Sequence, residues 1–132
     1  MDRKRGLGRE VLGPGLLAGL LLAGLLSSWE MSTTHYSISR QVEDAAWLAL
    51  SEDWEAARSA AAAAESRWEQ HRDLSSLLAD HTPMEQIDAL FARMDLYSAA
   101  RDREEFAAAC GELSRYVKAM GDAHRLTWQN LL

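Results

Sequence analysis

Residues 54–71 read WEAARSAAAAAESRWEQH and carry the clearest hydrophobic period in the chain. One face is formed at spacings of three and four by Trp54, Ala57, Ala61, Ala64, Trp68 and His71. This spacing predicts an amphipathic helix with one buried stripe. Alanine fills the centre of the stripe, so a neighbouring helix can approach closely there. We interpret the stripe as a packing seam.

Helix-capping signals divide the rest of the chain. Ser51-Glu52-Asp53 precedes Trp54, Thr82-Pro83-Met84-Glu85 is a capping box with proline in the first turn, and Asp102 precedes two acidic residues. We expect Gly121 to close the last helix and residues 127–132 to fold back as an apolar tail. Further periodic faces are formed by His35, Ile38, Val42, Ala45 and Ala49; by Met84, Ile87, Leu90, Phe91, Met94 and Tyr97; and by Phe106, Ala109, Cys110, Leu113, Tyr116, Val117 and Met120.

The connections between consecutive expected helices are short, which forces neighbouring helices to be antiparallel. Alanine, leucine, glutamate and arginine dominate, and no run of alternating β-branched residues indicates a strand. The predicted fold class is all-α, with an N-terminal transmembrane helix followed by an up-and-down four-helix bundle. The expected divisions are a basic N-terminus at 1–10, an anchor at 11–29 and a bundle at 30–132.

The anchor is predicted from residues 11–29, VLGPGLLAGLLLAGLLSSW, which carry no charge. As a helix this stretch is roughly 28 Å long, enough to cross a bilayer. A cleaved signal peptide is the alternative, but leucine stands where a cleavage site needs a small residue. Four basic residues precede the stretch, Arg3, Lys4, Arg5 and Arg9, so the N-terminus is expected in the cytoplasm and the bundle outside it. The expected location is a single-pass cell-membrane protein.

Small residues recur every four positions in this stretch, at Gly15, Gly19 and Ala23. Such a face permits close contact between membrane helices. These three residues are the candidate contact with a membrane-protein partner or a second copy, although glycine and alanine are also common in such segments.

Charge is distributed unevenly along the chain. The chain has 14 basic and 20 acidic residues, and residues 1–10 hold four and two of them, which leaves the remainder with a net charge of −8. An acidic surface repels nucleic acid, so no nucleic-acid partner is expected. The single cysteine, Cys110, cannot form an intrachain disulfide and is predicted to be a buried, inert thiol.

Few residues suggest chemistry. His71, Asp80 and His81, followed by Glu85 and Asp88, could in principle ligate a divalent metal. Their spacing matches no established site, and the two histidines fit packing and helix ends better. No Ser-His-Asp order, glycine-flanked serine or Cys-His pair is present in the sequence. We expect no catalytic residues, no cofactor, no metal and no enzymatic activity.

Several short motifs together resemble a known family. They are Asp53-Trp54-Glu55-Ala56-Ala57, Trp68-Glu69-Gln70-His71, Leu77-Leu78-Ala79-Asp80-His81, and Ile87-Asp88 followed by a second hairpin. The chain resembles domain-of-unknown-function family 4363, an uncharacterised bacterial family of small single-anchor helical proteins. Alanine and arginine replace the family's Lys/Glu-rich second helix. The resemblance implies the helical topology behind one anchor and implies no reaction.

The sequence therefore predicts an anchored, extracytoplasmic helical module that interacts with a membrane or envelope complex. The alternative is a helical domain that senses a small ligand or a metal through its interior. A polar cluster in the core or a groove favours sensing, whereas exposed Trp47, Trp128 or Leu131 favours a protein partner.

Overall fold

The computed structural model describes the backbone of residues 3–75 and 81–131, and within these ranges the side chains of 12–26, 33–72, 83–123, 126 and 130. By its internal contacts the chain divides into two compact units, Met1–Met31 and Ser32–Leu132, each described by itself. The described residues form four helices and no strand: α1 (Arg3–Leu50), α2 (Trp54–Ser75), α3 (His81–Ala100) and α4 (Arg103–Leu131). The predicted all-α class is confirmed.

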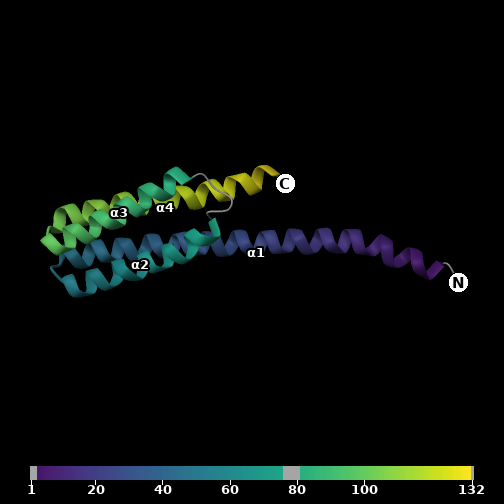
Figure 1. Cartoon of the computed structure of the whole chain (residues 1–132), viewed down its shortest axis with the longest axis horizontal. Coiled ribbons are helices and arrows are strands. Elements are labelled where there is room, and N and C mark those ends of the chain that lie inside the picture. The colour runs from purple at the N-terminus through teal and green to yellow at the C-terminus, as the bar shows by residue number, and fades with distance from the viewer. Residues whose placement is uncertain (1–2, 76–80, 132) are drawn as a thin grey trace. The chain divides into compact units, whose positions relative to one another are not determined.

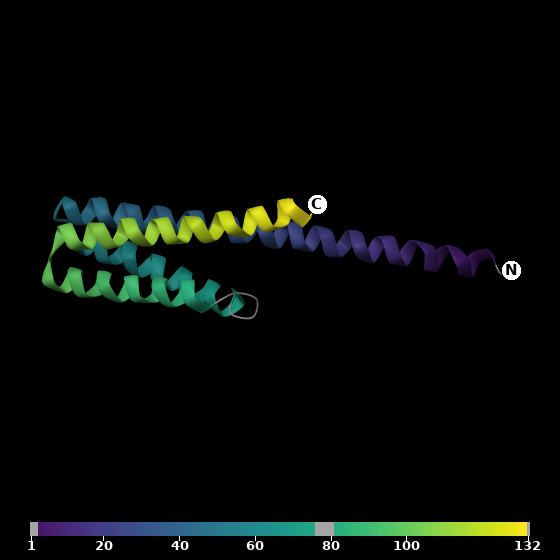
Figure 2. The same cartoon turned by 90° about the horizontal axis from the view of Figure 1, so that it is seen from above.

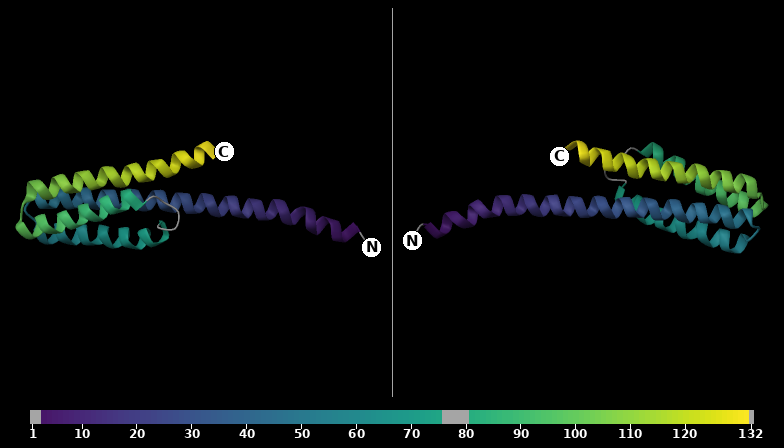
Figure 3. Two further views of the ribbon diagram at one scale, coloured as in Figure 1. Left: turned by 45° about the horizontal axis from the view of Figure 1, so that its top comes forward. Right: turned by 180° about the vertical axis from the view of Figure 1, so that it is seen from behind.

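The second unit is a helical bundle built from two antiparallel hairpins. The first hairpin pairs the part of α1 within this unit with α2, and the second pairs α3 with α4 (Figures 1 and 3). Both turns lie at the same end of the bundle, where Arg103 Nη1 and Glu52 Oε1 are 3.2 Å apart. Seen from above, α4 lies beside α1 and α3 lies beside α2 (Figure 2). This is the predicted up-and-down order.

The core is formed by the periodic faces that the sequence indicates. In the first hairpin the buried residues of α1 and α2 are arranged symmetrically about Asp53, because an antiparallel hairpin pairs residues equally far from its turn. The buried pairs at equal distances from Asp53 are Ala49 and Ala57, Val42 and Ala64, Ile38 and Trp68, and His35 and His71. The second hairpin adds a similar set about Asp102: Met94 and Cys110, Phe91 and Leu113, and Ile87 and Val117.

The first turn is a Schellman motif followed directly by a new helix. Asp53 N donates to Leu48 O at 2.9 Å, and Glu52 N donates to Ala49 O at 2.9 Å. Glu52 has a φ of 65°, the left-handed conformation that usually belongs to glycine at this position. Asp53 then caps α2, because its Oδ1 accepts a bond from Ala56 N at 3.3 Å. Asp53 thus contributes its backbone N–H to the end of α1 and its side chain to the start of α2.

The second turn repeats this geometry. Asp102 N donates to Tyr97 O at 3.0 Å, and Arg101 N donates to Ser98 O at 3.2 Å. Arg101 has a φ of 53°, and Asp102 Oδ1 accepts from Glu105 N at 3.2 Å. The predicted cap at Asp102 is confirmed. Both hairpins therefore use the same turn.

Two helix boundaries differ from the expectation. Gly121 does not end the last helix, since α4 continues to Leu131, and residues 127–131 are helical instead of a folded-back tail. Gly121 faces α1, where a Cβ atom would lie 3.3 Å from His35 Cβ. Gly121 therefore allows α4 to pack closely against α1 and does not cap the helix. α3 begins at His81, before the capping box, because proline is tolerated in the first turn of a helix.

The first unit contains the apolar stretch at 11–29. Of this stretch the side chains of residues 12–26 are described. Eight leucines here are between 45% and 69% exposed: Leu12, Leu16, Leu17, Leu20, Leu21, Leu22, Leu25 and Leu26. Among the described residues, no helix meets the length and apolarity needed to cross a membrane.

Candidate functional site

A chain of polar side chains joins α1 to α4. Ser39 Oγ and Ser114 Oγ are 2.7 Å apart in the buried interior. Ser114 Oγ donates to Glu43 Oε1 at 2.7 Å, so the hydroxyl of Ser39 is the donor in the first bond. Lys118 Nζ lies 2.7 Å from the same Glu43 oxygen. These bonds satisfy the buried hydroxyls, and they fix the register of the two helices.

The hydrogen bonds to Glu43 also set its charge state. The bond from Lys118, and then the bond from Ser114, lower the pKa of Glu43 below its ordinary value of 4.5. The positive charges of Lys118 and Arg40 act in the same direction, while partial burial opposes them. Glu43 is therefore a structural carboxylate, held ionised, and not a proton donor at neutral pH.

A second polar set joins α2 to α3. Trp68 Nε1 donates to Asp88 Oδ1 at 2.9 Å, and Arg72 Nη1 lies 2.9 Å from Asp88 Oδ2. Both carboxylate oxygens of Asp88 are thus engaged. The sequence allows Asp88 to be a metal ligand, whereas in the structure its carboxylate binds the buried Trp68 ring.

Two histidines meet inside the first hairpin. The rings of His35 and His71 have centroids 4.7 Å apart and stand nearly perpendicular, at 86°. His35 is 2% exposed and His71 is 8% exposed, and the Trp68 ring lies 6.4 Å from His71. The interpretation of His71 as a packed histidine is confirmed. The close pair was not predicted, although both residues are equally far from Asp53 and the hairpin symmetry could have revealed it.

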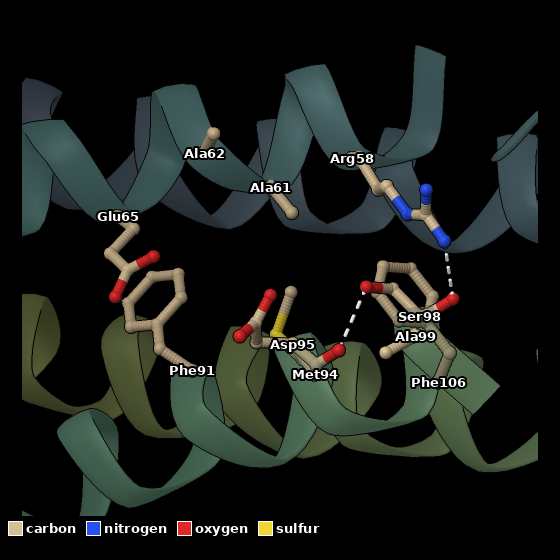
Figure 4. Close-up of a pocket in the computed structure, with 10 residues that line it drawn as sticks. All are labelled: Arg58, Ala61, Ala62, Glu65, Phe91, Met94, Asp95, Ser98, Ala99 and Phe106. Atoms are coloured by element: carbon tan, nitrogen blue, oxygen red, sulfur yellow. Dashed lines mark hydrogen bonds between the residues drawn. The ribbon is translucent and has the colours of Figure 1, made fainter. Parts of the chain in front are cut away.

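A hollow, which we call the groove, lies between α2 and α3. It has a volume of about 580 Å³ and is lined by residues of α2, α3 and Phe106 of α4. Figure 4 shows Glu65 reaching from α2 toward the Phe91 ring at one end and Arg58 at the other, with Asp95 of α3 between them. Alanines of α2 leave the space open, because their short side chains do not fill the gap between the helices.

The two ends of this groove differ in charge. At one end Arg58 Nη2 donates to the carbonyl oxygen of Ser98 at 2.7 Å, which satisfies an acceptor in the last turn of α3. At the other end Glu65 has no positive neighbour among the groups that shift its pKa. Partial burial, and then the charges of Glu69, Asp95 and Asp88, raise the pKa of Glu65 above 4.5.

The residue types that metal binding needs do not come together in the described part of the chain. Cys110 is fully buried, and burial raises the pKa of its thiol to about 12, which makes it inert as predicted. No group of three or more His, Cys, Asp or Glu side chains within the described residues is placed to hold a metal. Of the candidate ligands, Asp80 and the side chain of His81 lie outside the described residues.

The candidate membrane-helix contact lies on α1 in the first unit. A Cβ atom added to Gly15 or Gly19 would meet no atom within 4 Å, and Ala23 is exposed. In the second unit Trp47 is 71% exposed and Leu96 is 65% exposed. The side chains of Trp128 and Leu131 lie outside the described residues. Trp47, Trp128 and Leu131 are the predicted apolar contact residues, and Trp47 is the one of them whose side chain is described and exposed.

Comparison with known proteins identifies one family. A model described as a domain of unknown function (DUF4363) matches residues 25–131, which include every residue of the bundle discussed above. No curated protein and no solved structure matches the chain. The resemblance inferred from the helical motifs is confirmed.

Proposed function

Given that the chain belongs to the DUF4363 family of unknown function, we propose that it is a membrane-anchored protein whose acidic bundle binds proteins outside the cytoplasm. It serves as an accessory module of a membrane or envelope complex and catalyses no reaction. The family match begins at residue 25, so most of the proposed anchor precedes it.

The observation that carries the proposal is the exposure of the leucines between Leu12 and Leu26. Successive helical residues are about 100° apart, so these leucines surround α1 instead of forming one stripe. A helix that is apolar on every side is unfavourable in water and stable in hydrocarbon, where its backbone groups bond within the helix. The hydrocarbon core of a lipid bilayer is such an environment.

The orientation follows from charge. Arg3, Lys4, Arg5 and Arg9 precede the leucines, and positive residues are retained in the cytoplasm. The bundle, with its net charge of −8, then faces the other side. Its acidic surface favours proteins or cations as partners over nucleic acid.

A protein-binding role is supported by the surface of the bundle. Trp47 and Leu96 are large apolar side chains that remain more than half exposed. Tryptophan is enriched at protein interfaces, where its large ring is buried by a partner. The polar sets at Glu43 and Asp88 bond to neighbouring helices and are engaged in holding the bundle together.

Alkaline extraction of membranes from cells that produce the full chain tests the anchor. The wild-type chain should stay with the lipid, and the double variant Leu16→Arg, Leu20→Arg should appear in the soluble fraction, since each arginine costs about 3 kcal/mol at the centre of a membrane helix. Leu96→Arg, at an exposed leucine of α3, is the matched control and should stay with the lipid. Extraction of the wild-type chain would refute the anchor.

A second candidate function is the sensing of a small organic cation in the groove between α2 and α3. The uncompensated carboxylate of Glu65 beside the Phe91 ring favours it, because an amine with an apolar body finds both a charge and an aromatic face there. Calorimetry with benzylamine tests this idea. Binding by the wild-type chain that is lost in Glu65→Gln and kept in Glu55→Gln supports it, and equal heats in all three reject it.

A further inference from the structure

The outward side of α1 in the bundle carries two exposed aromatic residues with two charges between them. Tyr36, Arg40, Asp44 and Trp47 follow at spacings of four, four and three, so they share one helical face, which we name the α1 strip. Tyr36 is 47% exposed, Trp47 is 71% exposed, and both charged residues are exposed. The buried residues of α1 lie on the opposite face.

We propose that the α1 strip binds the α1 strip of a second copy of this chain, with the two helices parallel. The proposal rests on the anchoring proposed above, because two copies inserted in one membrane with the same orientation present their α1 helices side by side and in the same direction. A two-fold axis between the helices then brings identical residues together.

Charge complementarity selects a second copy as the occupant. The bundle part of the chain is acidic, so two copies repel each other over most of their surfaces. The α1 strip carries one positive and one negative group and is neutral. In a parallel pair, Arg40 of each copy lies one helical turn from Asp44 of the other, which gives two reciprocal ion pairs. Two copies can therefore approach through this face.

The aromatic residues supply the apolar contact. In the parallel arrangement the two Trp47 rings meet at one end of the charged pairs and the two Tyr36 rings meet at the other. The sequence spacing agrees. Gly15 and Leu22 precede Tyr36 by whole heptads, and Gly19 and Leu26 precede Arg40 by whole heptads. Repeats of seven residues are typical of helices that pair along their length.

Disulfide crosslinking of the full-length chain in membranes tests the pairing and its direction. Ser51 is exposed one turn beyond Trp47, so Ser51→Cys should form a crosslinked dimer when the helices are parallel. In an antiparallel pair the two copies of residue 51 would stand at opposite ends. Ser59→Cys, exposed on α2, is the control and should remain monomeric. The natural Cys110 is fully buried and contributes no crosslink.

Charge reversal tests the role of the strip. Arg40→Asp and Asp44→Arg should each lower the crosslinked fraction of the Ser51→Cys chain about tenfold, since two weak attractions become repulsions. Two differently tagged chains, one carrying each reversal, should crosslink to each other when produced together, because their strips are complementary. Failure of this mixed pair, or crosslinking unchanged by either reversal, would overturn the proposal.

Fractionation of the same membranes distinguishes a failure of the pairing from a failure of the proposed anchor. A chain that stays in the membrane fraction but gives no Ser51→Cys dimer overturns the pairing and leaves the anchor intact. A chain that crosslinks in the soluble fraction overturns the anchor and supports the strip. Dimers that are lost in Gly19→Leu but unchanged in Arg40→Asp would place the contact in the apolar segment and overturn the strip.

Discussion

Individual residues in this bundle are placed by what they bond across a helix interface. Glu43 lies near the surface, yet its carboxylate accepts bonds from both Ser114 and Lys118 of α4. Asp88 does the same between Trp68 and Arg72 of α2. In both cases one carboxylate on one helix organises two residues on its neighbour. The residues with the strongest polar contacts therefore maintain the fold.

Replacement of Glu43 by glutamine should destabilise the bundle at neutral pH by about 1 kcal/mol, a modest value because the ion pair is half-exposed. The pKa of Glu43 is lowered in the folded state, so its stabilisation is present above the ordinary value of 4.5 and is lost as the pH falls through the folded value. The difference in thermal unfolding between wild type and Glu43→Gln should thus shrink toward pH 3. A difference in thermal unfolding that is constant from pH 7 to pH 3 would contradict the lowered pKa of Glu43 in the folded state.

At the scale of the helix and its turn, the two hairpins are built alike. Each ends its first helix with a non-glycine residue at positive φ, Glu52 or Arg101, and then begins the next helix at an aspartate cap. The left-handed conformation is unfavourable for a residue with a Cβ atom by about 1 kcal/mol. These turns hold because the bonds on both sides of them satisfy the ends of four helices.

Arg101→Gly should therefore stabilise the bundle by about 0.5 to 1 kcal/mol, since glycine adopts positive φ without steric strain. Arg101→Ala removes the same side chain and keeps the strain, so it serves as the control and should leave stability nearly unchanged. Denaturant unfolding of the full-length chain in detergent measures both. Equal effects of glycine and alanine would show that the backbone conformation is not strained.

The contact of α4 with α1 at Gly121 gives a second prediction for the helices. Gly121→Leu should destabilise the bundle by about 2 kcal/mol, because even its Cβ atom would lie 3.3 Å from His35 Cβ. Gly111→Ala, on the same helix with open space around it, should instead stabilise by about 1 kcal/mol through helix propensity. Thermal unfolding of both variants checks the opposite signs. Destabilisation by both, or by neither, would contradict the packing described here.

The sequence predicts the stripes and caps well because both depend on local spacing. The face from Trp54 to His71 is buried or half-buried, and the caps at Asp53 and Asp102 bond as expected. Gly121 was misread because glycine signals a helix end and a close helix contact equally well. The sequence does not reveal the groove at Glu65 or the chain of polar side chains at Glu43, because both depend on how neighbouring helices are rotated about their axes.

At the scale of the whole molecule, the chain combines an apolar segment with an acidic bundle, and it belongs to a family whose function is unknown. No group of three or more metal-ligating side chains lies together among the described residues, and the polar sets at Glu43 and Asp88 bond to neighbouring helices. The surface of the bundle includes the α1 strip, the exposed Leu96 and the groove, and the bundle carries a net negative charge. These features support the proposal of a module that contacts other chains beside a membrane, and the rest of that proposal depends on where the bundle is located.

Thiol labelling of intact cells tests that location most directly. Glu55→Cys places a thiol on an exposed position of α2, and Gly6→Cys places one before the apolar segment, while Cys110 is buried. A maleimide that does not cross membranes should label Glu55→Cys in intact cells and Gly6→Cys only after lysis. Labelling of Gly6→Cys in intact cells, or of Glu55→Cys only after lysis, would contradict an anchored bundle outside the cytoplasm.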